Sequence, residues 1–251
     1  MSEEADTDGP RSGEGTDWVG AEDLEAARTY AAWFETPLGQ RVWADERRAL
    51  GELLGPVDGH RMLDAGAGDG RFAVEASAEG AEVTALDLSP AMLSVARERA
   101  RERSMALEAV EGDVTALPFP SSSFDRAVTV TVLCFVPDPF RAVQELARVL
   151  RPGGVRVIGE LGLWSPWNLR RWLRGRRGDP MWAGAHFWRL RELRALTGQA
   201  GLRPGGWSSA VFYGRRTHGL RCWRLVERVL RGRTSLGATF LAFRAVKPGE
   251  G

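Results

Sequence analysis

The chain has 251 residues, of which 43% are hydrophobic and 27% charged, and a formal net charge of +1 at pH 7. This length suits one large domain with a sizeable core. Two cysteines exclude a disulfide-stapled scaffold and favour a reducing, cytoplasmic location. No apolar run approaches the roughly 20 residues that a membrane-spanning helix needs.

The small net charge conceals an asymmetry between the two halves of the chain. Residues 1–140 carry a balance of −15, whereas residues 141–251 carry a balance of +16. A basic half of this kind is either a solvated face or a surface that attracts an anionic partner. The sequence leaves both interpretations open.

The N-terminal part contains no strand pattern. Residues 1–17 are acidic and rich in glycine, which predicts a disordered tail. Residues 18–56 predict two helices that form a lid, with a break near Thr36-Pro37.

From about residue 57 to 251, strands and helices alternate, which is the pattern of a parallel α/β sheet. Between residues 161–188 and again between 214–236 the pattern is interrupted by insertions, the first rich in tryptophan and arginine. We expect both insertions to cover the ligand site. The seven predicted strands lie near residues 61–64, 82–87, 107–111, 124–132, 155–159, 206–213 and 238–246. The helices predicted among them cover residues 71–78, 91–103, 139–150 and 190–199, and a further one lies within the second insertion.

A glycine-rich turn, LDAGAGDG at residues 63–70, follows the first strand. Such turns usually cradle phosphate at a helix N-terminus. Here Arg71 stands where the dinucleotide fingerprint G-x-G-x-x-G would need glycine, and no Gly-Lys-Ser/Thr occurs in the chain. Asp64 and Asp69 would repel a pyrophosphate, at a cost of about 1–4 kcal/mol for like charges about 4 Å apart. The turn therefore predicts a ligand that carries positive charge.

Two more acids stand at the ends of the next strands. Asp87 lies 21 residues after Gly66 and can accept hydrogen bonds from both hydroxyls of a ribose. Asp113 follows the third strand, where it can reach an exocyclic amine. Adenine, ribose, a sulfonium and an amino-acid tail satisfy all of these groups together, which describes S-adenosylmethionine.

Four ordered blocks resemble the class I S-adenosylmethionine-dependent methyltransferases. The resemblance is to the small-molecule group that contains quinone C-methyltransferases and malonyl-carrier-protein O-methyltransferases. The blocks are LDAGAGDG (63–70), VTALDLSPAML (83–93), GD with LPFP and SFD (112–125), and ELARVLRPGG (145–154). The resemblance implies a Rossmann-like, doubly wound sheet, S-adenosylmethionine as cofactor, S-adenosylhomocysteine as product, and an enzyme that transfers methyl groups.

The resemblance also implies roles for individual residues in cofactor binding. Gly66 and Gly68 would pack under the methionine part, and Asp64 would hold its ammonium group. The remaining contacts would be Asp87 at the ribose, Leu88 and Met92 around the adenine, Asp113 with the Val114 backbone at the adenine amine, and Thr131. Two departures concern the loop, where Ala67 and Asp69 replace the common Cys and Thr, and residues 132–136, which lack the histidine often found there.

The acceptor should lie beyond the carboxyl ends of the strands, between residues 131–135 and 160–167. Glu160 is our candidate for a base or an acceptor-orienting group, although pairing with a nearby arginine is an equally good interpretation. His186 is the second catalytic candidate, against an ordinary structural role. The candidate acceptor contacts are Tyr30, Phe34, Cys134, Trp164, Trp167 and Arg171. For the aromatic residues the alternative is helix packing, and for Cys134 it is a place in the core. No spacing typical of metal ligands occurs.

The segment at residues 164–177, WSPWNLRRWLRGRR, has three interpretations. It is an acceptor lid, a segment that rests on an anionic membrane, or a solvated cover. Nucleic-acid binding is disfavoured because no recognised RNA module accompanies it.

The expected function is methylation of a small, partly hydrophobic acceptor that can carry negative charge. The alternatives are a cofactor-binding regulator or partner subunit without transfer activity, and methylation of a macromolecule or lipid docked on the basic half. The sequence does not predict the oligomeric state.

Overall fold

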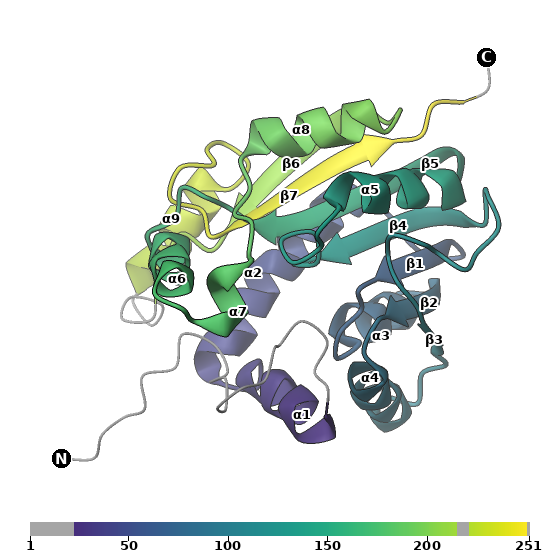
Figure 1. Ribbon diagram of the computed structural model, residues 1–251, viewed down its shortest axis with the longest axis horizontal. Coiled ribbons are helices and arrows are strands. Elements are labelled where there is room, and N and C mark those ends of the chain that lie inside the picture. The colour runs from purple at the N-terminus through teal and green to yellow at the C-terminus, as the bar shows by residue number, and fades with distance from the viewer. Residues whose placement is uncertain (1–22, 215–220, 250–251) are drawn as a thin grey trace.

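A seven-stranded sheet runs through the centre of the protein in the computed structural model, which describes residues 23–214 and 221–249 (Figure 1). The predicted tail at residues 1–17 and part of the second insertion, residues 215–220, lie outside this range. The strand order is β3-β2-β1-β4-β5-β7-β6. The strands are β1 (Arg61–Ala65), β2 (Glu82–Asp87), β3 (Glu108–Glu111), β4 (Phe124–Val130), β5 (Leu150–Leu161), β6 (Arg203–Ala210) and β7 (Phe240–Val246).

The sheet is parallel except for β7, which runs antiparallel to both β5 and β6. This confirms the predicted Rossmann-like, mostly parallel sheet. The strand order reverses between β1 and β4, where Asp64 of β1 pairs with Val128 of β4 and with Ala85 of β2. In open α/β sheets, ligands bind beyond the carboxyl ends of the strands at such a reversal.

Helices cover both faces of the sheet (Figure 1). One layer is formed by α2 (Pro37–Leu54), α3 (Arg71–Ala78) and α4 (Pro90–Glu102), and the other by α5 (Pro139–Val149) and α8 (Leu190–Gln199). The helix α1 (Leu24–Trp33) packs on α4 rather than on the sheet. Three helices come from the insertions: α6 (Pro166–Arg176), α7 (Pro180–Ala183) and α9 (Arg221–Leu230).

Five of these helices begin with a Ser, Thr or Asp followed by proline. The side chain of the first residue accepts a backbone hydrogen bond from the first turn, as in Ser89 to the Met92 N–H at 3.2 Å and Asp138 to the Arg141 N–H at 2.9 Å. Proline suits the next position because its fixed φ is helical and its missing N–H would have no partner there. The five pairs are Thr36-Pro37, Ser89-Pro90, Asp138-Pro139, Ser165-Pro166 and Asp179-Pro180.

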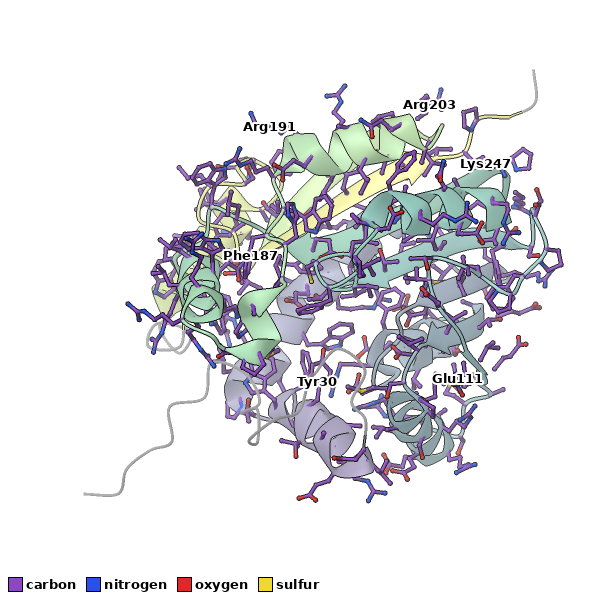
Figure 2. All side chains as sticks on the ribbon, viewed as in Figure 1. Tyr30, Glu111, Phe187, Arg191, Arg203 and Lys247 are labelled. Atoms are coloured by element: carbon purple, nitrogen blue, oxygen red, sulfur yellow. The ribbon has the colours of Figure 1, made fainter. Side chains whose placement is uncertain are left out.

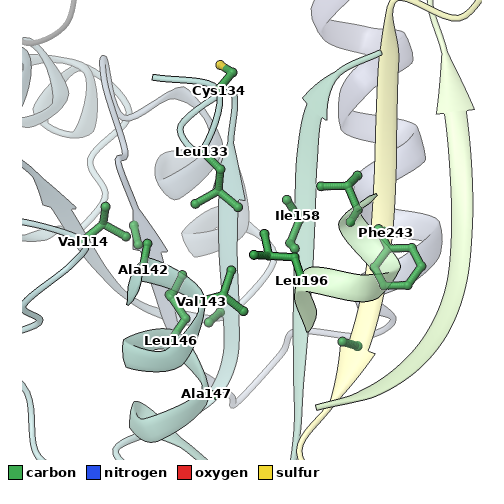
Figure 3. Packing of buried hydrophobic residues seen from close by; sticks show 14 of the residues in the cluster. Val114, Leu133, Cys134, Ala142, Val143, Leu146, Ala147, Ile158, Leu196 and Phe243 are labelled. Carbon is green, nitrogen blue, oxygen red and sulfur yellow. The ribbon is translucent and has the colours of Figure 1, made fainter. Parts of the chain in front are cut away.

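Both faces of the central strands are buried. On one face, Val143 and Leu146 of α5 pack with Leu196 of α8 against Ile158 and Phe243 (Figure 3). On the other face, side chains of α2 and α3 form a second cluster with Val128, Val157, Phe240 and Ala242. Burial on both sides explains why residues 124–132, which contain β4, read as a nearly continuous apolar run.

The structure differs from the sequence expectation in two places. The sequence Arg-Pro-Gly-Gly at residues 151–154 predicts a sharp turn before the strand at 155–159. These residues instead belong to β5, but they bulge out of the ladder, because Leu150 pairs with Phe124 while Val155 pairs with Arg126. Residues 161–188, which have no clean periodicity, form α6 and α7. Among the described residues, no helix combines the length and hydrophobicity required to cross a membrane.

Candidate functional site

A pocket of about 450 Å³ opens at the carboxyl ends of the parallel strands. Its walls come from the β1–α3 turn, the end of β2, the loop after β3 and the β4–α5 loop, with Tyr30 from α1 and Met181 from α7. Tyr30 lies on the side of α1 that faces the sheet (Figure 2). A smaller hollow of about 60 Å³ shares Tyr30, Gly66, Gly68 and Thr131 with the pocket and also contains Asp64.

The three glycines of the β1–α3 turn all have left-handed backbone angles, with φ of 78° at Gly66, 53° at Gly68 and 70° at Gly70. A Cβ at Gly66 would lie 2.3 Å from Val132, and one at Gly70 would lie 2.5 Å from Ala96. At Gly68 a Cβ would meet no atom within 4 Å. Since Gly68 lines both hollows, a side chain there would fill space that a ligand can use.

Asp64 stands at the end of β1 with only 1% of its surface exposed. Among the described residues, its Oδ2 has no hydrogen-bond partner. Burial, together with the neighbouring Asp87 and Asp69, raises the pKa of Asp64 to about 8. A buried, unpaired carboxyl oxygen is costly without a cation or donor, so this position suits an ammonium group.

Asp87 is held against the glycine turn. Its Oδ2 accepts a hydrogen bond from the Gly68 N–H at 2.8 Å, and its Oδ1 accepts one from the Ser89 N–H at 2.9 Å. Each carboxylate oxygen has a second lone pair, which suits a ribose diol. Asp113 also lines the pocket, where its Oδ1 accepts a hydrogen bond from the Thr115 N–H at 2.7 Å.

Asp69 lines the smaller hollow, but arginines balance its charge. It forms salt bridges with Arg99 at 2.7 Å and with Arg71 at 3.3 Å, and Arg71 also pairs with Glu35 at 2.9 Å. The Arg71 guanidinium lies 4.9 Å from the centre of the Phe34 ring. These contacts neutralise Asp69 and attach the α1–α2 connection to the glycine turn.

Thr131 has an unusual backbone conformation at the tip of β4. Its φ is 57°, which is rare for a β-branched residue. The Thr131 N–H donates to the Gly159 carbonyl at 2.7 Å. Such strain is typical of functional sites, and Thr131 lines both hollows.

Glu160 is not at the pocket, contrary to expectation. The side chain is fully buried, and its Oε1 accepts hydrogen bonds from the N–H groups of Leu133 at 2.7 Å and Val132 at 3.2 Å. Burial raises the pKa of Glu160 to about 7. Cys134 is also buried and does not line the pocket, and burial raises the pKa of its thiol. Glu160 therefore supports the turn after β4 instead of contacting the acceptor.

Four other predicted residues lie away from the pocket. His186 is about half exposed, with its Nε2 3.6 Å from Glu192. Trp164 lines a different hollow, while Trp167 and Arg171 are buried together, the guanidinium 4.8 Å from the indole centre. The sequence of the Trp/Arg segment, residues 164–177, gave no indication of which face of α6 would be buried.

The pocket also contains residues that sequence reasoning did not single out. Phe135 and Val136 follow β4, Met181 comes from α7, and Arg141 comes from the first turn of α5. The first two lie at or beside the stretch expected to line the site. Met181 had no recognisable signal, because the insertion that carries it lacks periodicity.

Comparison with known proteins identifies the domain. A sequence family described as a methyltransferase domain matches residues 63–158. Demethylmenaquinone methyltransferases are 40% identical over 125 residues in Renibacterium salmoninarum and 44% identical over 115 residues in Clavibacter sepedonicus. These alignments cover 49% of each chain in the first case, and 45% of this chain and 46% of the relative in the second.

A longer match extends beyond the family domain. An uncharacterised protein of Mycobacterium tuberculosis is 36% identical over 177 residues, which cover 70% of this chain and 58% of that protein. The chain thus spans about half the length of the curated relatives that it matches.

Solved structures share the fold at lower sequence identity. An S-adenosylmethionine-dependent methyltransferase from Thermotoga maritima has a TM-score of 0.69 at 24% identity and covers 89% of this chain and 97% of its own. The [4+2]-cyclase SpnF has a TM-score of 0.62 at 22% identity, covering 81% of each chain.

The fold and the pocket define a Rossmann-like protein with a pocket at the reversal of its strand order. Residues 63–158 match a methyltransferase domain, and the chain shares the fold of solved S-adenosylmethionine-dependent methyltransferases.

Proposed function

We propose that this protein transfers the methyl group of S-adenosylmethionine to a small, partly hydrophobic acceptor. The observation that carries the proposal is the unpaired Oδ2 of Asp64 beside the cradle of Gly66 and Gly68. The same cavity continues past Asp87 into a mostly apolar chamber. A cation site, a diol site and an apolar chamber in one pocket fit this cofactor and such an acceptor.

The residues present fit each part of the cofactor. Asp64 would hold the ammonium group and Asp87 the ribose hydroxyls, with Gly68 leaving room for the methionine part. The remaining lining residues suit the adenine ring and its amine: Leu88, Met92, Asp113 and Val114.

The acceptor would occupy the chamber between Tyr30, Val132, Phe135 and Met181. Apolar walls favour a lipophilic molecule, and the names of the demethylmenaquinone methyltransferase relatives agree with this class. Arg141 supplies the cationic side chain among the described lining residues, and its exposure at 55% places it near solvent. It would attract an anionic group at the mouth of the pocket.

When bound, the cofactor supplies a methyl group on a sulfonium: the acceptor atom would bond to the methyl carbon, and the electrons of the broken C–S bond would stay on sulfur in the S-adenosylhomocysteine that leaves. The protein must align the two molecules and exclude water. Glu160 is buried outside the pocket, with its Oε1 bound by the Leu133 N–H, and burial raises the pKa of the Tyr30 phenol, which keeps the phenol protonated. We therefore favour an acceptor whose reacting atom is already ionised or carries no proton, so that no strong base is required.

Helix α1 would close one side of the site. Tyr30 reaches both hollows from this helix, and Glu35, just beyond its end, is tied to the glycine turn through Arg71. The other predicted lid helix, α2, packs on the sheet as part of the core. Of the two predicted lid helices, we therefore assign the lid to α1 alone.

Replacing Asp87 with Ala tests the cofactor site. The variant loses a charged acceptor of the ribose hydroxyls and the hydrogen bond to the glycine turn. We expect S-adenosylmethionine to bind more weakly by about 1.5–3 kcal/mol in calorimetric titration. Glu102→Ala, at an exposed acid on α4, is the matched control and should bind as the wild type does. Equal affinity of both variants and the wild type would refute the assignment of Asp87.

Transfer is tested by incubating the protein with cell extract and methyl-labelled S-adenosylmethionine. Label in the organic fraction supports a lipophilic acceptor, and label in the aqueous fraction indicates a polar one. Label in macromolecules contradicts the small-molecule proposal. Cofactor binding without any label in repeated extracts favours the regulator alternative.

A further inference from the structure

Exposed apolar side chains are concentrated at one part of the surface. Among the described residues, eight large hydrophobic side chains are exposed, and one of them, Leu88, belongs to the cofactor pocket. The other seven lie in two short stretches: Trp164, Leu169, Trp172, Leu173, Leu225, Val229 and Leu236. Singly scattered apolar residues need no explanation, but a concentrated set indicates an interaction site.

On α6 the buried and exposed faces are distinct. Trp167, Asn168 and Arg171 are buried, whereas Trp172 and Leu173 point to solvent with 39% and 40% of their surface exposed. Asn168 fixes this orientation, because its side-chain amide donates to the Gly162 and Thr239 carbonyls at 2.8 Å each. The apolar outer face of α6 is therefore held outward by the fold.

On α9 a buried acid fixes the orientation. Glu227 accepts hydrogen bonds from the Val211 N–H at 2.9 Å and the Phe212 N–H at 3.0 Å. Leu225 and Val229, four residues apart, are 56% and 49% exposed on the outer side. Exposed arginines at positions 224 and 228 stand beside them.

The two helices belong to one end of the molecule. The chain between α9 and β7 is bonded to the start of α6 through the Gly237 N–H and Trp164 carbonyl at 2.8 Å, and through the Ser165 and Thr239 hydroxyls at 2.7 Å. Figure 1 shows α6 and α9 at the same end, toward which the parallel strands point.

A shallow hollow of about 460 Å³ adjoins them, with arginine side chains around apolar walls. The Arg189 guanidinium lies 5.2 Å from the Trp164 ring centre. Arg191 lies at the outer edge of α8 (Figure 2). The lining residues are Leu163, Trp164, Arg189, Leu190, Arg191, Arg194, Ser235 and Leu241.

The charge of this region is strongly positive. Residues 161–236 contain 16 arginines, no lysine and three acids. Each acid has a local partner: Asp179 pairs with Arg174, Glu192 accepts from the Arg189 N–H at 2.8 Å, and Glu227 binds backbone as described. Arg231 also pairs with Glu52 outside this segment, whereas Arg191, Arg194, Arg224 and Arg228 are exposed and can meet an external anion.

We propose that α6, α9 and the hollow beside them form a docking surface for an anionic lipid bilayer. Tryptophan and leucine side chains would enter the boundary between headgroups and acyl chains, while arginines bind the phosphates. Five of the seven exposed apolar side chains are aliphatic and offer no ring on which a base could stack, which makes a single-stranded nucleic acid the weaker candidate. The bilayer matches both the apolar residues and the charge.

The docking surface would also lie close to the chamber that we propose for a lipophilic acceptor. Helix α7 follows α6 directly and places Met181 in the wall of the acceptor chamber. A molecule leaving the bilayer would thus meet the chamber one short helix away. This last step rests on the proposed function, whereas docking does not require the cofactor or transfer activity.

The test is flotation of the full chain with phosphatidylcholine vesicles, with and without phosphatidylglycerol. We expect binding to the anionic vesicles that declines as salt is added, because salt screens the arginines. Trp172→Ala with Leu173→Ala should lower the partition coefficient by about tenfold or more, through lost apolar burial. Arg191→Glu with Arg194→Glu should lower it at least as much.

The matched control is Arg101→Glu with Arg103→Glu, which makes the same charge change at exposed positions near the end of α4. It should keep most of the vesicle binding. Thermal unfolding and cofactor titration establish that each variant is folded, so a failed fold is not mistaken for lost docking.

Three results would overturn the proposal. The first is that the wild type does not bind anionic vesicles. The second is that the control variant loses as much vesicle binding as the surface variants do. The third is that an equimolar RNA oligonucleotide displaces the bound protein from the vesicles. Failure of methyl transfer alone would leave the docking result unaffected, so the two proposals can fail separately.

Discussion

At the residue scale, Asp64 combines a structural cost with the binding role that we propose for it. Its carboxyl is buried beside two other acids, and one oxygen has no partner among the described residues. The same arrangement that destabilises the ligand-free fold attracts an ammonium group. Sites that bind charge commonly show this exchange of stability for function.

Asp64→Asn should reveal this cost as a change in pH dependence. The pKa of Asp64 is raised from 3.8 to about 8, so the folded state keeps a proton that the unfolded chain releases. Its contribution to the free energy of unfolding therefore falls as pH rises from about 4 to about 8. The variant cannot ionise, and we expect it to be more stable than the wild type by about 1–3 kcal/mol at pH 8.

Urea unfolding of the ligand-free proteins across this pH range measures the difference. The curves should converge near pH 4 and separate above it, while the variant binds S-adenosylmethionine more weakly. Glu46 and Glu160, whose pKa values burial also raises, titrate in both proteins and do not affect the comparison. Parallel curves would show that Asp64 is ionised in the ligand-free fold.

At the scale of elements, the glycine turn between β1 and α3 combines two different requirements. Gly70 permits close packing of the turn on Ala96 of α4, whereas Gly68 leaves space inside the pocket. All three glycines have positive φ, yet the neighbours of each position differ. The turn therefore serves packing at one end and ligand binding at the other.

Alanine substitutions separate these requirements. Gly70→Ala brings a Cβ to 2.5 Å from the Ala96 Cβ, and we expect a loss of about 2–4 kcal/mol in the free energy of unfolding. Gly68→Ala should cost only about 1 kcal/mol, from its positive φ, but should weaken cofactor binding by about tenfold or more. Denaturation and calorimetric titration of both variants measure this, and similar stability losses would contradict the assignment.

At the scale of the whole molecule, acidic and basic residues are concentrated in different halves of the chain, and one arginine is buried in the core. The acidic half contains Asp64, Asp87 and Asp113, to which we assign cofactor binding, and the basic half supplies the proposed docking surface. Arg156 of β5 is fully buried, and none of its three side-chain nitrogens has a hydrogen-bond partner among the described residues. Burial lowers the pKa of Arg156 to about 9, against the opposing effect of Glu160.

Arg156→Met should stabilise the protein. Arg156 shares its side of β5 with Ile158, which packs in the cluster between the sheet, α5 and α8. Methionine would fill similar volume without a desolvated charge, and we expect the free energy of unfolding at pH 7 to rise by about 1–3 kcal/mol. Arg151→Met, at an exposed arginine paired with Asp125, is the control and should lower stability or leave it unchanged. A destabilised Arg156 variant would indicate that the guanidinium has a stabilising partner.

Much of the fold was predictable from the sequence because its signals are local. Apolar runs locate the strands, and the Ser-Pro and Asp-Pro pairs begin helices through contacts within one turn. The predicted cofactor residues also follow strand ends directly, and parallel strands bring such ends together. Eight of the nine line the larger pocket, and Asp64 lies in the adjoining hollow.

Tertiary structure alone decided the roles that depend on distant partners. Glu160 lies at a strand tip, as expected, but its Oε1 accepts hydrogen bonds from backbone donors 27 and 28 residues away in sequence. Asp69 is neutralised by Arg99, 30 residues further along the chain. Arg171 faces inward and Met181 enters the pocket because α6 and α7 pack in one particular orientation. The sequence by itself determined the strand-and-turn frame and the chemistry at its ends, since these depend on neighbouring residues. Which charges remain available to a ligand depends on long-range contacts, and only the folded chain decides those.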